Sequence, residues 1–93
     1  MGFHEDCLVL DGHTDVPTRL WEQPVSLAER RSDRHVDLPR LREGGVDAIV
    51  FALYVPASLD AEKGWKHARE LHRISVEQIE EVPGMEVVVS AED

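Results

Sequence analysis

The sequence predicts an α/β fold, a βαβαβ unit in which parallel strands alternate with helices. Three short apolar runs indicate the strands, at residues 7–10, 46–55 and 85–89. Two segments that carry helix-capping residues separate these runs. Because such alternation implies right-handed crossovers, we expect one parallel sheet within a single partial domain, residues 1–93.

The length of the chain limits the fold. With 93 residues it accommodates one domain at most and buries only roughly 60–65% of its unfolded surface. A complete (β/α)₈ barrel, which takes roughly 250 residues, is excluded for these residues alone. The 42% hydrophobic content also argues against disorder, because disordered chains lack the apolar residues that offset the entropy of ordering.

The charge balance argues against two classes of partner. The 10 Lys and Arg residues against 19 Asp and Glu residues give a net charge of −9, which disfavours nucleic acid and anionic membrane surfaces. Cys7 is the only cysteine, so no intrachain disulfide can form. The sequence shows no secretory signal pattern, and no apolar segment reaches the roughly 20 residues that span a bilayer. We therefore expect a cytoplasmic protein.

The first strand is expected at residues 7–10. This apolar run is closed by a turn, which is typical of a strand buried on both faces. Residues 18–35 are the least regular part of the chain. Within them, Ser26 and Glu29 match a capping box, which predicts a short helix over about residues 27–31.

The next helix is expected to begin at Asp37, which suits an N-cap, with Pro39 tolerated in the first turn. Its inward-facing residues are expected to be Leu38 and Leu41. Gly44 and Gly45 end it, because glycine adopts the left-handed C-cap conformation without a steric clash. The nearly unbroken apolar run over residues 46–55 then suits a parallel strand covered by helices on at least one face.

The longest helix is expected to begin at Ser58 or Asp60 and to end at Pro83 and Gly84. On a helical wheel one side is apolar, which predicts an amphipathic surface helix. The residues on this side are Trp65, Ala68, Leu71, Ile74, Ile79 and Val82. The third strand is expected directly afterwards, at residues 85–89.

Candidate metal ligands follow the first strand. In an extended chain, residues two apart point the same way, so His13 and Asp15 can converge on one point. An imidazole nitrogen and a carboxylate oxygen suit Zn²⁺ and similar ions. Active sites of parallel α/β folds also lie at the carboxyl ends of strands. On spacing alone, however, a polar turn explains a His-x-Asp pattern more often than a metal site does.

The remaining histidines have simpler explanations. His35 and Asp37 repeat the same spacing, but they precede a helix, so Asp37 is better explained as an N-cap and His35 as a loop residue. His67 and His72 lie five residues apart on the long helix and do not share a face. We expect both on the flanks of that helix.

Three other residues each have two interpretations. Tyr54, near the carboxyl end of the second strand, either presents its hydroxyl at the same rim as His13 or packs in the core with a wet edge. Trp21 either lines a pocket or fills the core. Cys7 begins a strand expected to be buried, which favours an inert core thiol over a nucleophile.

Three separated motifs resemble one family. The opening strand of the membrane (renal-type) dipeptidases, zinc dipeptidases within the amidohydrolase-like barrels, is similar to residues 8–17 (LVLDGHTDVP). The family's first helix and turn are similar to residues 35–46 (HVDLPRLREGGV), and the end of its second strand resembles residues 53–56 (LYVP). The resemblance covers essentially the whole chain in order. It implies the N-terminal portion of a (β/α)₈ TIM-type barrel, with its first three strands.

The resemblance also implies an activity, the zinc-dependent hydrolysis of dipeptides. In the family two metal ions, roughly 3.5–4 Å apart, act on a bridging hydroxide and the scissile carbonyl. By position, His13 and Asp15 match two ligands of one zinc, and Tyr54 matches a residue at the substrate-facing rim. Thr14 and Val16 stand where the family usually has Asn and Leu, and neither is a ligand.

The same resemblance implies that the site is incomplete within these residues. The family's bridging carboxylate and second-site histidines come from strands after the third, whereas this sequence ends at Asp93. We therefore expect the isolated chain to be inactive, whether it is a truncated form, a natural short gene or one piece of a split enzyme with a complementary C-terminal chain. One alternative is a non-catalytic α/β module that associates through open sheet edges, with itself or a partner. Another is a different metal hydrolase of the wider amidohydrolase group.

Overall fold

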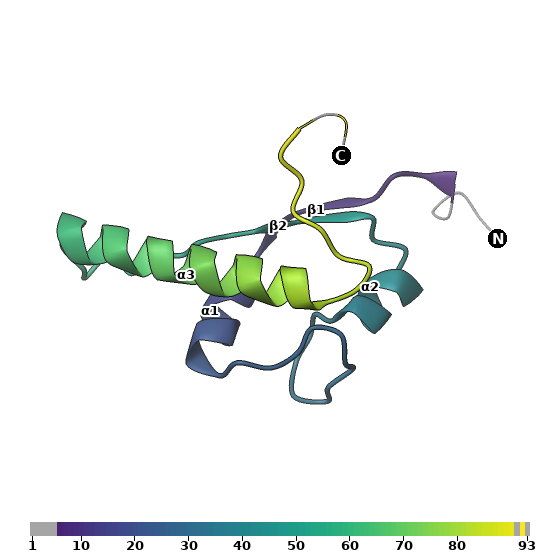
Figure 1. Ribbon diagram of the computed structural model, residues 1–93, viewed down its shortest axis with the longest axis horizontal. Coiled ribbons are helices and arrows are strands. Elements are labelled where there is room, and N and C mark those ends of the chain that lie inside the picture. The colour runs from purple at the N-terminus through teal and green to yellow at the C-terminus, as the bar shows by residue number, and fades with distance from the viewer. Residues whose placement is uncertain (1–5, 91, 93) are drawn as a thin grey trace.

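The computed structural model describes residues 6–90 and 92 (Figure 1). Its elements follow in the order β1 (Leu10–Thr14), α1 (Val16–Glu22), α2 (Leu38–Glu43), β2 (Ala48–Phe51) and α3 (Ala61–Glu81). The strands β1 and β2 pair in parallel. The predicted α/β class and the parallel strand direction are therefore confirmed. In the view of Figure 1, α3 runs between the two strands and α1. The helix α3 packs against α1.

The pairing of β1 with β2 contains one irregularity. Leu10 pairs with Ala48 and Asp11 with Ile49, but the next pair is Thr14 with Phe51. Three steps along β1 therefore match two steps along β2, which places one extra residue in β1. An extra residue of this kind is a β-bulge, which bends the strand and re-aims its side chains.

The prediction for the first strand was wrong in its position and its burial. β1 begins at Leu10, not at residue 7, and continues to Thr14, so His13 lies within the strand. The exposed fraction of Leu8 is 83% and that of Leu10 is 61%. The reason is that the core covers one face of the sheet, the face on which Phe51 lies. Leu10 pairs with Ala48, which lies three residues before Phe51 on β2. Because side chains alternate along a strand, Ala48 and its neighbour Leu10 face the opposite, open side of the sheet.

The other two strand predictions also need correction. β2 covers only Ala48–Phe51 of the predicted residues 46–55, because its partner strand ends at Thr14. Residues 85–89 form no strand, so the sheet has two strands within the part of the chain that the structure describes. Val88 and Val89 are exposed by 64% and 83%. An apolar run becomes a strand only when a neighbouring strand accepts its backbone hydrogen bonds.

The segment predicted to be least regular contains a helix, α1, and lacks the short helix expected over residues 27–31. Pro17 lies in the first turn of α1, where its fixed φ favours helix and no hydrogen bond is lost. At Leu27 the backbone oxygen accepts a hydrogen bond from the Leu38 nitrogen (2.7 Å), and the backbone nitrogen donates to Gln78 Oε1 (2.9 Å). The Leu27 carbonyl therefore bonds to Leu38 and not to a residue of a local helix. The Leu27 side chain packs in the core.

The helix α2 begins and ends as predicted. Asp37 is its N-cap, and Oδ1 of Asp37 accepts a hydrogen bond from the Arg40 backbone nitrogen at 2.9 Å. Pro39 occupies the first turn, and the helix stops before Gly45, whose φ of 73° is the left-handed conformation that glycine favours.

The long helix α3 begins at the predicted cap, where Asp60 Oδ1 accepts from the Lys63 nitrogen at 2.8 Å. Leu71 and Val82 are buried as predicted. The prediction for Trp65 was wrong, because 65% of that residue is exposed. The buried face is centred on Gly64, where an added Cβ would lie 3.1 Å from Val55 Cγ1. Trp65 follows Gly64 and so lies about 100° around the helix from this contact.

The core lies between the helices and the inner face of the sheet. Its main cluster contains four buried residues, Val16, Leu20, Leu27 and Val82, and Leu71 is a fifth buried hydrophobic residue. Partly buried side chains surround them, among them Phe51 of β2 and Ile74 of α3. Because Val16 belongs to this cluster, the packing fixes the start of α1 directly after the candidate ligand Asp15.

Candidate functional site

His13 and Asp15 lie side by side at the carboxyl end of β1. The His13 Nε2 atom is 3.3 Å from Asp15 Oδ1, and the two side chains are 70% and 60% exposed. The expected convergence of these two side chains is therefore observed. His13 lies in the irregular part of β1, and Asp15 is the residue between β1 and α1. The bulge thus stands where it can aim both side chains at the same point.

Asp15 occupies a position at which a carboxylate usually caps a helix. It is the N-cap residue of α1, where an Asp side chain normally accepts a hydrogen bond from the helix backbone. With φ −94° and ψ 26°, Asp15 makes no such capping bond within the described chain. Its carboxylate therefore remains open to His13 and to a cation.

The spacing of these two atoms fits two ligands of one zinc ion. With metal–ligand distances of about 2.0–2.1 Å, neighbouring ligand atoms of a tetrahedral shell lie roughly 3.3–3.4 Å apart. The 3.3 Å between His13 Nε2 and Asp15 Oδ1 agrees with this separation. Over residues 6–90 and 92, however, no group of three or more His, Cys, Asp and Glu side chains could hold a metal ion. The pair therefore fits half of a tetrahedral site and not a complete one.

Tyr54 follows β2 on the neighbouring strand end. The Ala52 nitrogen donates to the Thr14 oxygen at 2.9 Å, so the segments that lead to Tyr54 and to Asp15 leave the sheet side by side. With 56% of Tyr54 exposed, the interpretation as a core residue is wrong.

A cavity of about 200 Å³ lies beside Asp15. Its polar wall includes Asp15, Arg19, Arg34 and His35, and its apolar wall includes Val25 and Leu27. His35, which the sequence placed in a loop, thus borders the same cavity as a candidate ligand. No local pattern indicates this, because the residues meet only after the loop from α1 to α2 folds back over α1.

Arg34 is the buried cation of this cavity, with an exposed fraction of 8%. Its Nη2 atom donates to the Gln23 backbone oxygen at 2.7 Å. Its Nε atom is buried and has no hydrogen-bond partner among the described residues. The Arg34 backbone oxygen accepts from Arg40 Nη1 at 2.9 Å, which ties the loop to α2. Nothing in the sequence pattern distinguishes Arg34 from the other arginines of its segment.

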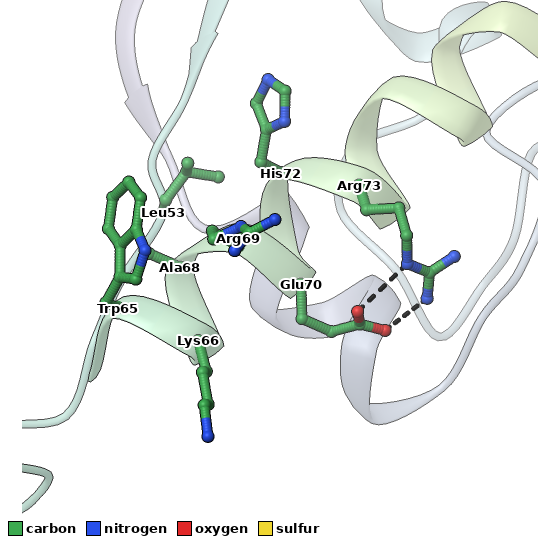
Figure 2. A pocket seen from close by; sticks show the side chains of 8 residues that line it. All are labelled: Leu53, Trp65, Lys66, Ala68, Arg69, Glu70, His72 and Arg73. Carbon is green, nitrogen blue, oxygen red and sulfur yellow. Dashed lines mark hydrogen bonds and ion pairs between the residues drawn. The ribbon is translucent and has the colours of Figure 1, made fainter. Parts of the chain in front are cut away.

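A second, larger hollow of about 690 Å³ lies on the outer side of α3. Figure 2 shows Trp65 and Leu53 at one end of it and the Glu70–Arg73 pair at the other. Hydrogen bonds from Arg73 lower the pKa of Glu70, and the same contacts raise the pKa of Arg73. His72 borders this hollow and is exposed, as expected of a flank residue. The hollow does not include the His13–Asp15 pair.

The structure also places Trp21 and His67, which lie in contact with each other. The Trp21 ring meets the His67 ring edge-on, with 4.9 Å between centroids and an interplanar angle of 89°. Since 49% of Trp21 is exposed, it joins α1 to α3 at the surface and does not fill the core. His67 is half-buried on the α1 side of α3.

Comparisons with known proteins give one match. The family described as membrane dipeptidase matches residues 2–93. Neither the curated proteins nor the solved structures include a significant match to the chain. No helix among the described residues is long and apolar enough to cross a membrane.

Proposed function

Because the chain belongs to the membrane dipeptidase family, a family of peptidases, we propose that His13 and Asp15 are two ligands of a zinc ion that serves the hydrolysis of dipeptides. The observation that carries the proposal is the 3.3 Å approach of His13 Nε2 to Asp15 Oδ1 at the end of β1. The donor types support it, since an imidazole nitrogen and a carboxylate oxygen are common zinc ligands.

The residues of the chain have separate tasks in this proposal. A bound zinc ion would supply Lewis acidity for the scissile carbonyl and for a water molecule. His13 presents Nε2, and Asp15 presents a carboxylate that no capping bond occupies within the described chain. The β1 bulge holds the two donors together. Tyr54 is exposed at the neighbouring strand end and is proposed to contact the substrate.

We further propose that these 93 residues carry half of one zinc site. Two protein ligands leave half of a tetrahedral shell to water, so tight binding and turnover are not expected of the isolated chain. Support comes from the described residues, which contain no third ligand for the pair. The remaining ligands are proposed to come from a further segment or a complementary chain.

Zinc titration of the 93-residue chain tests the ligand assignment. Zn²⁺ should shift the imidazole NMR signals of His13, with weak affinity, and Asp15→Ala should remove the effect. His72→Ala is the matched control, because His72 is exposed on α3 outside the pair, and it should leave the His13 shifts unchanged. An unchanged His13 signal at saturating Zn²⁺ would contradict the zinc site. Robust dipeptide turnover by the chain alone, abolished by His13→Ala, would instead overturn the half-site.

A second candidate function is a non-catalytic module that associates through its open sheet. The observation that favours it is the uncovered face of the sheet, on which Leu10 is 61% and Val50 47% exposed. Open strands with exposed apolar residues invite pairing with another chain. Sedimentation equilibrium separates the cases, because a strictly monomeric folded species would rule out self-association.

A further inference from the structure

Arg34 is a buried charge that makes no direct ion pair among the described residues, although the Asp33 carboxylate interacts with it at longer range. Its exposed fraction is 8%, and its hydrogen bonds go to neutral acceptors, the Gln23 backbone oxygen at 2.7 Å and Gln23 Oε1 at 3.4 Å. Its Nε–H donor has no partner in the described chain. A buried charge is costly unless an opposite charge or a full set of hydrogen bonds compensates it. An anion at Arg34 would supply both.

The adjoining cavity defines the size of that anion. Its volume of about 200 Å³ is below the roughly 300–1,000 Å³ of pockets that hold drug-sized ligands. A ligand of only a few heavy atoms therefore fits. Because Nε is shielded even from water, contact between a ligand oxygen and Nε requires the side chains that line the cavity to move.

The walls of the cavity define its chemistry. Arg34 and Arg19 line the cavity together with the acidic residue Asp15, and Arg19 Nη1 also pairs with Glu22 Oε1 at 3.7 Å. Val25, Leu27 and Val36 form an apolar wall. A bare inorganic anion such as phosphate would lose its hydration against these side chains and gain no donor in return. A carboxylate with a short apolar body matches both walls, with its oxygens toward Arg34 and its hydrocarbon toward the valines.

We propose that this cavity is a binding site for a small carboxylate that carries an apolar side chain, with Arg34 as the group that binds the anion. Asp15 belongs both to this cavity and to the His13 pair, so the site adjoins the candidate metal ligands. The chemistry is that of a short branched acid or of the terminal residue of an apolar dipeptide. The identification with a dipeptide rests on the proposed function, whereas the carboxylate site rests on Arg34 and the cavity.

Titration of the metal-free 93-residue chain with isovalerate, followed by ¹⁵N NMR, tests the site. Isovalerate should shift the Arg34 Nε–H signal and the Val36 amide, and the neutral isostere isovaleramide should not. Arg34→Gln should weaken binding about tenfold or more, the usual effect of losing a hydrogen bond to a charged group. Arg69→Gln is the matched control, because Arg69 is exposed on α3 and lies outside this cavity.

A second variant covers the case in which Arg34→Gln does not fold. Val25→Phe keeps the arginine and fills the cavity, and it should abolish the isovalerate shifts while the Arg34 Nε–H signal remains. The proposal is overturned if isovalerate gives no shift at Arg34, if isovaleramide binds equally, or if Arg69→Gln weakens binding as much as Arg34→Gln.

A dipeptide arm tests the identification of the ligand. Glycyl-leucine should compete with isovalerate, and its C-terminal amide should not. Isovalerate binding without such competition would overturn the dipeptide identification alone. Because no metal is present, failure of the zinc proposal leaves these outcomes unchanged.

Discussion

Arg40 Nη1 lies 2.6 Å from Asp37 Oδ2, and this ion pair joins the first turn of α2 to the loop before it. The same Arg40 atom donates to the backbone oxygens of Arg31 (2.7 Å) and Arg34 (2.9 Å). Asp37 itself is 2% exposed and also caps α2. One buried carboxylate thus organises the loop that carries Arg34.

Asp37→Ala should therefore destabilise the fold far more than the loss of a helix cap does. The variant loses both the cap and a hydrogen bond between charged groups, which together cost about 2–4 kcal/mol of the free energy of unfolding. Asp60→Ala is the matched control, since Asp60 caps α3 in the same way but is exposed, and it should cost about 1 kcal/mol. Urea denaturation of both variants measures the difference. Equal losses would show that Asp37 acts only as a cap.

The register of the buried face of α3 gives a second prediction. Leu71 is fully buried, whereas Trp65 is 65% exposed, although the apolar periodicity places both on one side. Leu71→Ala should lower the free energy of unfolding by about 2–5 kcal/mol, the usual cost of a core cavity. Trp65→Ala should cost about 0.5 kcal/mol or less, as is typical of surface sites. A larger loss for Trp65→Ala would mean that α3 is rotated relative to this structure.

The parts of the fold that sequence reasoning predicted are those fixed by neighbouring residues. The caps at Asp37 and Asp60 and the stop at Gly45 depend on bonds within one turn, and all three are observed. The strand over residues 85–89 was wrong because strand formation depends on a partner elsewhere in the chain. The helix over residues 27–31 was wrong for a similar reason, since Leu27 bonds to Leu38 and Gln78 instead.

The candidate site divides in the same way. The approach of His13 to Asp15 could be predicted because the two residues are close in sequence, whereas the bulge in β1 and the position of Asp15 beyond the strand could not. The cavity could not, because Arg34 and His35 reach Asp15 only through the fold of a loop without periodicity. Burial of Arg34 depends on the packing of that loop against α1, and the sequence shows an arginine among other charged residues.

The pair formed by Glu70 and Arg73 on the outer side of α3 predicts a pH effect. The Arg73 guanidinium hydrogen-bonds the Glu70 carboxylate and lowers its pKa from the ordinary value of 4.5. A carboxyl group whose pKa is lower in the folded than in the unfolded state adds stability above the unfolded value. That contribution is lost as the pH falls through the folded value. The stabilisation from this pair should therefore be present at neutral pH and vanish below pH 4.5.

Arg73→Gln tests this effect directly. It should raise the pKa of Glu70 toward 4.5 in an NMR titration of the side-chain carboxyl carbon, because the hydrogen bond that lowers it is gone. The difference in stability between wild type and Arg73→Gln should shrink as the pH falls. Lys66→Gln is the matched control, since it removes an exposed cation that pairs with Glu62 at 3.4 Å and not with Glu70. A Glu70 pKa that is unchanged in Arg73→Gln, or that shifts equally in Lys66→Gln, would show that the net charge of the helix controls the titration and that the Arg73 contact does not.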